Sequence, residues 1–129
     1  MNERVEQELS LLRAVYPDLD WRGDVLWARI PSYVVPAMMW KQREVEIAFQ
    51  IPGELPGQAP YGFWVRPGLE AIDGRAISNY TYPVSIPFGD GWGQFSWSPV
   101  TWEPKADITT GSNMVNFVRS FADRLREGP

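Results

Sequence analysis

The chain has 129 residues, of which 44% are hydrophobic and 14% aromatic, enough for one hydrophobic core but too few for two. Its formal net charge of −4 argues against broad contact with nucleic acid, because Lys and Arg supply most of the affinity for phosphates. The absence of Cys and His excludes disulfides, thiol nucleophiles, Ser–His triads and zinc sites with nitrogen or sulfur ligands. We therefore expect one domain over residues 1–129 that binds no metal.

Other features that the sequence lacks exclude further classes of function. No stretch approaches the roughly 20 apolar residues of a membrane span, and the polar, acidic start does not resemble a secretory signal, so we expect a cytoplasmic protein without membrane contact. No glycine-rich phosphate-binding motif occurs, and no cofactor is expected. Carboxylates, hydroxyls and Lys are all that remain for chemistry, which leaves the chain poorly equipped for catalysis.

The first predicted element is a helix that begins after Asn2, a suitable N-cap, and ends at Pro17. Its apolar side chains recur with helical spacing, at Val5, Leu9, Leu12 and Tyr16. Glutamates early in this segment suit the positive end of the helix dipole.

Short strands follow this helix. Residues 24–30 form an apolar run that ends at Pro31, and residues 44–51 alternate apolar and polar side chains with period 2. Residues 61–65 form a short aromatic strand, whereas residues 67–104 are rich in turn signals.

The last predicted element is an amphipathic helix, with Asp107 or Thr110 as candidate N-cap and apolar residues at Met114, Phe117, Val118, Phe121 and Leu125. Two helices around a group of antiparallel strands indicate an α+β domain. We expect about four strands, with the C-terminal helix packed on the sheet.

A proline-spaced stretch connects two of the predicted strands. It reads Pro52-Gly53-Glu54-Leu55-Pro56-Gly57-Gln58-Ala59-Pro60, with prolines at the first, fifth and ninth positions. Because Pro lacks an N–H donor, such a segment can follow a sheet without pairing to it. The stretch resembles the P-x-x-Y-P-x-x-P-P segment of ubiquitin-conjugating (E2) and E2-like domains, with Leu55 in place of Tyr.

Further segments strengthen this resemblance. Residues 8–17 resemble the E-x-x-x-L-x-x-x-Y-P helix ending of RWD domains, and Trp102-Glu103-Pro104 is similar to the W-[ST]-P that precedes an E2 helix. Residues 66–77 look like a degenerate form of the H-P-N…N-G-x-I-C active-site stretch. The resemblance covers residues 5–126 and is nearest to bacterial E2-like families that accompany ubiquitin-like modifiers and E1-like enzymes. It implies a UBC/RWD-like fold.

The departures from the family lie at the active site. Arg66 replaces the family's His and Gly68 its Asn, while the thiol position falls nearest to Ser78, with Ser96 as an alternative. A serine hydroxyl without an adjacent base is a poor nucleophile, and no thioester can form. The chain is either a naturally non-catalytic member, comparable to UEV and RWD proteins, or an active E2 whose Cys was exchanged for Ser. The additional loss of His and Asn favours the natural origin.

Other residue clusters have mainly structural interpretations. Trp92, Trp97 and Trp102 could form an aromatic platform for a sugar or peptide, but we expect them to anchor the irregular segment on the sheet and last helix. Residues 38–40 (Met-Met-Trp) are expected to fill core rather than form an adaptable binding patch.

Charged clusters also have simple interpretations. Arg119, Arg124 and Arg126 are expected to be a solvated helix end rather than an anion site. Glu44 and Glu46 are expected on a solvated sheet face rather than in a glycosidase pair. We assign no chemistry to Lys41 or Lys105.

The leading hypothesis is a non-catalytic E2-like adaptor in a bacterial-type ubiquitin-like conjugation pathway, antiphage defence being one setting. It would bind a modifier, an E1-like enzyme or another E2-like protein. The alternatives are an active E2 carrying Ser in place of its Cys and an aromatic-rich domain that binds carbohydrate or peptide. The expected fold-signature residues are Pro52, Pro56, Pro60, Trp102 and Pro104.

Overall fold

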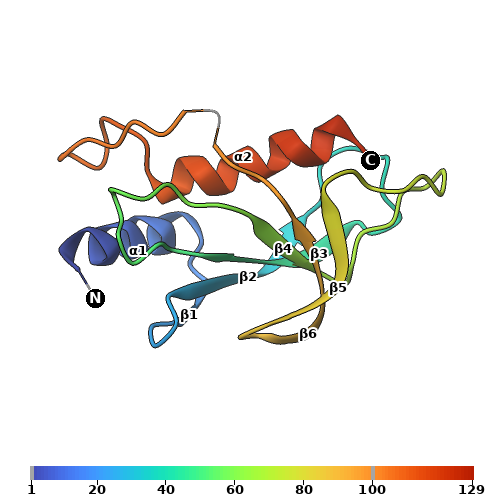
Figure 1. The fold of residues 1–129 in the computed structure, drawn as a ribbon, viewed down its shortest axis with the longest axis horizontal. Coiled ribbons are helices and arrows are strands. Elements are labelled where there is room, and N and C mark those ends of the chain that lie inside the picture. The colour runs from blue at the N-terminus through green and yellow to red at the C-terminus, as the bar shows by residue number, and fades with distance from the viewer. Residues whose placement is uncertain (1, 100) are drawn as a thin grey trace.

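The computed structural model describes residues 2–99 and 101–129 and shows an α+β architecture (Figure 1). An N-terminal helix precedes six strands, and a second helix ends the chain. The elements are α1 (Glu3–Val15), β1 (Asp20–Arg22), β2 (Trp27–Val34), β3 (Glu44–Gln50), β4 (Phe63–Arg66), β5 (Tyr80–Ile86), β6 (Gly89–Phe95) and α2 (Met114–Glu127).

Helix α1 forms as its sequence predicts. The Asn2 side chain accepts a hydrogen bond from the amide of Val5 at 2.7 Å, which caps the helix, and the last helical residue is Val15, two before Pro17. Val5, Leu9 and Leu12 are buried on one face. Glu8, which the apolar pattern does not predict to be buried, is fully enclosed on that face as well.

The sheet is antiparallel throughout, with the order β1-β2-β3-β4-β6-β5. The expectation of about four strands is therefore wrong. The two strands β5 and β6 lie within the turn-rich segment, where Gly89 and Gly91 belong to β6 rather than to a loop. Glycines can occupy an antiparallel ladder when neighbouring strands supply its hydrogen bonds, so their turn signal misleads here.

Strand β2 also differs from its prediction, because it begins at Trp27 and continues through Pro31 to Val34. The register against β3 shifts between Ile30 and Tyr33, so the proline occupies an irregularity in the ladder. The prediction for β3 is confirmed to within one residue, with Val45, Ile47 and Phe49 buried as expected and Ala48 buried as well.

One face of the sheet packs against both helices and forms the core. A single buried cluster joins α1, α2 and the inward side chains of the strands, and Phe63 and Phe121 stack at its centre with ring centroids 4.3 Å apart. In Figure 1, α2 crosses above the strands, while the β5–β6 hairpin extends away from it on the other side. The core thus lies between the sheet and the helices.

In the part of the chain that the structure describes, the other face of the sheet carries no helix, and charged side chains organise it. Glu46 on β3 accepts two hydrogen bonds from Arg66 on β4, at 2.7 and 3.0 Å, and also pairs with Arg29 on β2. The Arg66 guanidinium lies 4.5 Å from the ring centre of Trp92, which is fully buried. Glu46 therefore belongs to a partly shielded ion network, and the expectation of a freely solvated carboxylate is wrong for it.

Helix α2 begins later than either predicted cap would place it. Asn113 is the N-cap, and its side chain and that of Asn116 form reciprocal hydrogen bonds with each other's main-chain amides, at 2.9 and 3.1 Å. Asp107 instead closes a turn, because its carboxylate accepts hydrogen bonds from Thr109. The predictions of Asp107 and Thr110 as caps are therefore wrong, since a cap at Thr110 would have needed three more residues in helical conformation and a cap at Asp107 six.

Candidate functional site

The two candidate thiol positions lie at the same end of the β5–β6 ladder. Ser78 immediately precedes Asn79, whose carbonyl accepts a hydrogen bond from the amide of Ser96 at 2.9 Å. Both serines are exposed. Among the described residues, neither side-chain hydroxyl makes a hydrogen bond to a group that could act as its base. The geometry of both positions leaves the serines unactivated.

The backbone of Ser78 serves to anchor the end of the chain. Its amide donates to the carbonyl of Pro129 at 2.8 Å, and its carbonyl accepts from the guanidinium of Arg124 at 2.8 Å. A hollow of about 200 Å³ lies here between Ser78, Glu127 and Pro129. The Arg124 side chain also lines this hollow, and it donates to main-chain carbonyls on both sides of it.

Arg124 departs from its predicted role. It is only 4% exposed, donates to the carbonyl of Gly128 at 2.7 Å, and lies 5.0 Å from the ring centre of Phe95. Burial lowers the pKa of Arg124, although it still carries its charge at neutral pH. The prediction of a solvated helix end is thus wrong for Arg124, because the curled end of the chain covers it.

The structure brings two of the fold-signature segments together. The indole N–H of Trp102 donates to the carbonyl of Pro56 at 3.2 Å, across 46 residues of sequence. The segment from Pro52 to Pro60 forms no strand, as expected, and Pro60 is buried at its end. Pro104 lies beyond Trp102 in the irregular segment that leads to α2.

A groove of about 320 Å³ lies between α2 and the irregular segment before it. Two tryptophans, Trp97 and Trp102, contribute its aromatic walls, and Phe117 adds apolar surface. The other lining residues are Pro99, Thr101, Ser112, Asn116, Ser120, Asp123 and Glu127. Aromatic surface beside a few polar groups in a concave site is typical of ligand-binding positions.

The tryptophans of the groove are held by hydrogen bonds as well as by packing. The Trp97 indole donates to the hydroxyl of Ser120 at 2.9 Å, and this hydroxyl in turn donates to the carbonyl of Phe117. Both rings pack against the core, as the structural interpretation of these residues predicts. Trp92 does not join them, because its strand directs it to the helix-free face, against Arg66.

The sequence patterns do not identify the polar residues that line the groove on α2. Asn116, Ser120, Asp123 and Glu127 are spaced four, three and four residues apart, which places them along one stripe of α2. That spacing is readable in the sequence itself. The spacing does not by itself indicate a binding site, however, because any exposed helix face also shows a polar stripe.

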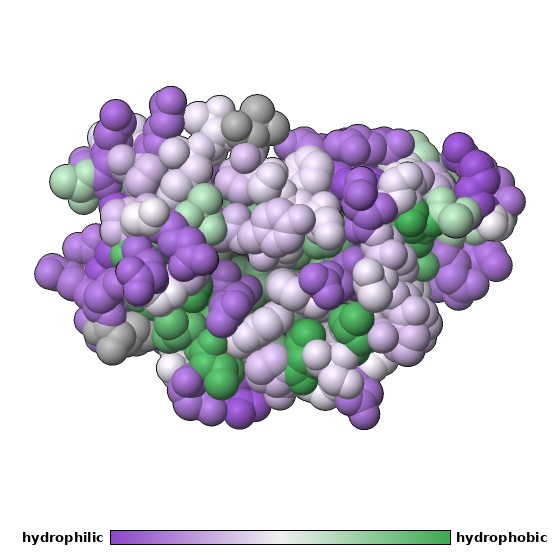
Figure 2. All heavy atoms as spheres, in the orientation of Figure 1, coloured by the Kyte–Doolittle hydropathy of each residue, from purple (hydrophilic) through white to green (hydrophobic). Residues whose placement is uncertain are grey.

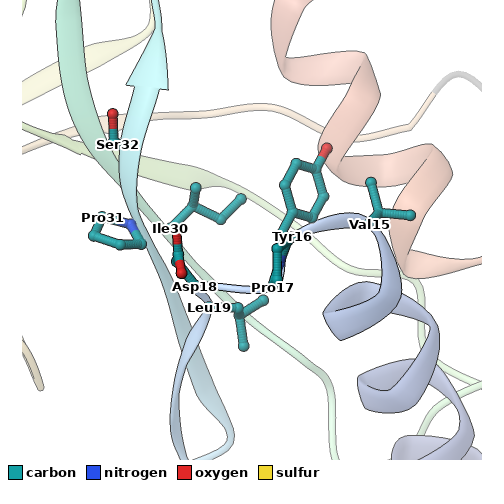
Figure 3. A pocket seen from close by; sticks show the side chains of 8 residues that line it. All are labelled: Val15, Tyr16, Pro17, Asp18, Leu19, Ile30, Pro31 and Ser32. Atoms are coloured by element: carbon teal, nitrogen blue, oxygen red, sulfur yellow. The ribbon is translucent and has the colours of Figure 1, made fainter.

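A smaller hollow of about 160 Å³ lies where α1 meets β2 (Figure 3). Figure 3 shows the Tyr16 ring between the end of α1 and α2, with its hydroxyl directed toward α2. Burial raises the pKa of Tyr16, and the positive charge of Arg119 partly opposes that change. Asp18 and Ser32 also line the hollow, but it contains no paired acid and base for catalysis.

The methionines before Trp40 do not fill the core. Trp40 itself is buried and donates to the carbonyl of Leu125 at 3.0 Å, whereas Met38 is 69% exposed. Met39 is 38% exposed and its carbonyl pairs with the amide of Ile72. The expected core role is wrong for both methionines, since their backbone forms a loop against residues 70–72. On the side drawn in Figure 2, hydrophobic surface appears only in small separate groups.

Comparison with known proteins gives no family. No protein-family model, no curated protein and no solved structure matches the chain. Within residues 2–99 and 101–129, no acidic cluster has the arrangement needed to hold a metal ion. In the same residues, neither helix has the length and apolar character of a membrane span.

Proposed function

We propose that this chain is a non-catalytic, E2-like binding protein of a bacterial-type ubiquitin-like conjugation pathway. It would hold a ubiquitin-like modifier, an E1-like enzyme or a catalytic E2-like partner without forming a thioester itself. The observation that carries the proposal is the environment of Ser78 and Ser96. Each stands where the resemblance places a thiol, and neither hydroxyl has a base beside it among the described residues.

Two further observations support an E2-like scaffold. The order of helix, antiparallel strands, irregular segment and helix agrees with the resemblance, with both helices on one face of the sheet. The contact of Trp102 with the Pro56 carbonyl joins two of the segments on which the resemblance rests. The six strands and the long β5–β6 hairpin are departures from the expected fold.

A pull-down tests the proposal. The chain is immobilised and exposed to the ubiquitin-like modifier, E1-like enzyme and E2-like protein encoded near its gene, before and after the E1 activates the modifier. We expect retention of at least one of them, without a thioester on the chain. No retention in either state, or a gene neighbourhood without such proteins, would contradict the proposal.

The alternative of an active E2 has its own test. Ser78→Cys and Ser96→Cys variants are incubated with the activated modifier, and products are separated with and without a thiol reductant. We expect no reductant-sensitive adduct on either variant, because no His or Asn supports the reaction there. An adduct on one variant would instead favour an E2 whose Cys has been exchanged. Binding to a glycan array, with no protein partner, would favour a carbohydrate-binding domain.

A further inference from the structure

The groove between Trp97, Trp102 and α2 has walls of two different characters. Aromatic surface lies on the side of the irregular segment, and the carboxylates of Asp123 and Glu127 lie toward the C-terminal end of α2. We propose that this groove binds an extended peptide segment of a partner protein that places a Lys or Arg side chain beside the two carboxylates. This inference rests on the proposed function, since it names the chemistry of the partner segment.

The length of the groove suits a short peptide. Its lining residues on α2 run from Asn116 to Glu127 at the end of the helix, and Ser112 lines it just before the helix. From Asn116 to Glu127 the helix advances roughly 16 Å at 1.5 Å per residue. An extended chain covers about 3.3 Å per residue, so about five residues span this distance.

The aromatic side is already ordered in the free protein. The indole N–H groups of Trp97 and Trp102 are bound to Ser120 and to the Pro56 carbonyl, which fixes the ring orientations. A ligand therefore meets preformed ring surfaces, and the two tryptophan side chains lose little conformational entropy on binding. Ring faces of Trp attract apolar side chains and cations alike, guanidinium groups in particular.

The charge of the groove favours a cation. Its lining includes two acids, Asp123 and Glu127, and among the described residues no Lys or Arg contributes to it. Two arginines lie close by. Arg126 is 3.9 Å from Asp123 in an exposed pair, and buried Arg124 donates to main-chain carbonyls. A long pair between exposed groups is weak, so a ligand cation can displace or share it.

The hydrogen-bonding groups favour a peptide over a sugar. The hydroxyl of Ser120 both accepts from Trp97 and donates to Phe117, and the hydroxyl of Ser112 accepts from the amide of Glu103. Among the described residues, the Asn116 side chain uses only its carbonyl oxygen, which leaves its amide group to donate to a peptide carbonyl. The carboxylates remain as acceptors, and they suit the N–H groups of Lys or Arg.

Fluorescence anisotropy with labelled pentapeptides tests the proposal. One peptide has Leu near one end and Arg at the other, and its matched partner has Gln in place of Arg. We expect the Arg peptide to bind about tenfold more tightly, with affinity that falls as salt is added. Equal binding of the two peptides, or no binding of either, would overturn the proposal.

Variants locate the site. Asp123→Asn with Glu127→Gln should weaken binding of the Arg peptide about three- to tenfold. Asp123→Asn alone serves as a second variant, because it keeps Glu127, whose negative charge acts on the buried Arg124. Glu3→Gln with Glu6→Gln removes the same charge from the exposed start of α1 and should leave the affinity unchanged. If both double variants weaken binding equally, the effect is one of net charge and the groove is excluded.

The same variants separate this inference from the proposed function. The chain could retain a modifier, E1-like or E2-like protein equally well with and without the groove substitutions. That result would overturn the groove as the peptide-binding site and would leave the adaptor role standing. Binding of the Arg peptide without retention of any such protein refutes the adaptor role alone. A glycan that binds while both peptides fail would replace the peptide as the occupant and overturn the inference.

Discussion

The side-chain carboxylate of Glu8 on α1 accepts a hydrogen bond from the main-chain amide of Met114, the first residue of α2, at 2.9 Å. The carboxylate is fully buried and is paired with Arg4 at 3.1 Å. Arg4 in turn donates to the carbonyls of Lys105 and Ser112, at 2.6 and 3.3 Å. One buried ion pair thus joins both helices and the irregular segment, at the end of the groove nearest the start of α2. The dipole of α2 favours negative charge at that position.

Replacing Glu8 should destabilise the protein strongly. Glu8→Ala leaves Arg4 and the Met114 amide without their partner, and we expect the free energy of unfolding to fall by about 3 kcal/mol. Glu8→Gln retains an acceptor and should cost less, about 1 kcal/mol. Urea denaturation measures both, with exposed Glu6→Gln as the control. Equal losses in Glu8→Gln and Glu6→Gln would show that the buried charge contributes nothing.

The ion network on the helix-free face should give a pH-dependent contribution to stability. Hydrogen bonds from Arg66, assisted by Arg29, lower the pKa of Glu46 below its ordinary value of 4.5. A lowered pKa in the folded state means that this stabilisation is present above pH 4.5 and is lost as the pH falls through the folded-state pKa.

Glu46→Gln should therefore be less stable than the wild type at pH 7 by about 1 kcal/mol, and the difference should shrink at acidic pH. Urea denaturation at a series of pH values measures it. Glu44→Gln on the same strand controls for the loss of one charge. A difference that stays constant from pH 7 to acid would refute the assigned role.

Two buried tryptophans allow a matched test of an indole hydrogen bond. Trp40 is 2% exposed and donates to Leu125, whereas Trp92 is fully buried and its N–H has no acceptor among the described residues. Phe substitution removes the N–H and similar volume from each. We expect Trp40→Phe to lower the free energy of unfolding by about 1 kcal/mol more than Trp92→Phe, because only Trp40 loses a bond. The reverse order in urea denaturation would contradict this prediction.

Gly93 on β6 has no space for a side chain. A Cβ atom there would lie 1.8 Å from the Tyr80 hydroxyl, which accepts a hydrogen bond from the amide of Leu69 at 3.0 Å. Gly93→Ala should displace the Tyr80 ring from Phe95 and cost about 2 kcal/mol or more. It should also lower the pKa of Tyr80 from about 12, because burial is the main cause of that value.

The matched control for this substitution is Gly53→Ala, where the added Cβ would only touch Leu26 at 3.4 Å. Thermal denaturation compares the two variants, and absorbance at alkaline pH follows tyrosine ionisation. Similar melting temperatures for both variants would show that β5 and β6 can separate enough to accommodate the methyl group.

The sequence alone determined the elements whose side chains follow a simple period. Helix α1, with its cap at Asn2, and strand β3 could be predicted because one face of each must be buried, which leaves a repeat of 3.6 or 2 residues. Strands β5 and β6 could not, because Pro83 and the glycines of β6 resemble turn residues. Their pairing depends on neighbouring strands rather than on local preference.

The candidate site depended still more on tertiary structure. The absence of Cys and His is a property of the sequence, and it alone limits the chemistry open to Ser78 and Ser96. Only the fold decided that Trp102 meets Pro56 across 46 residues, and that the acids of α2 share a groove with Trp97. Periodicity reports which side of an element is buried, whereas contacts between distant segments depend on how those buried sides pack together.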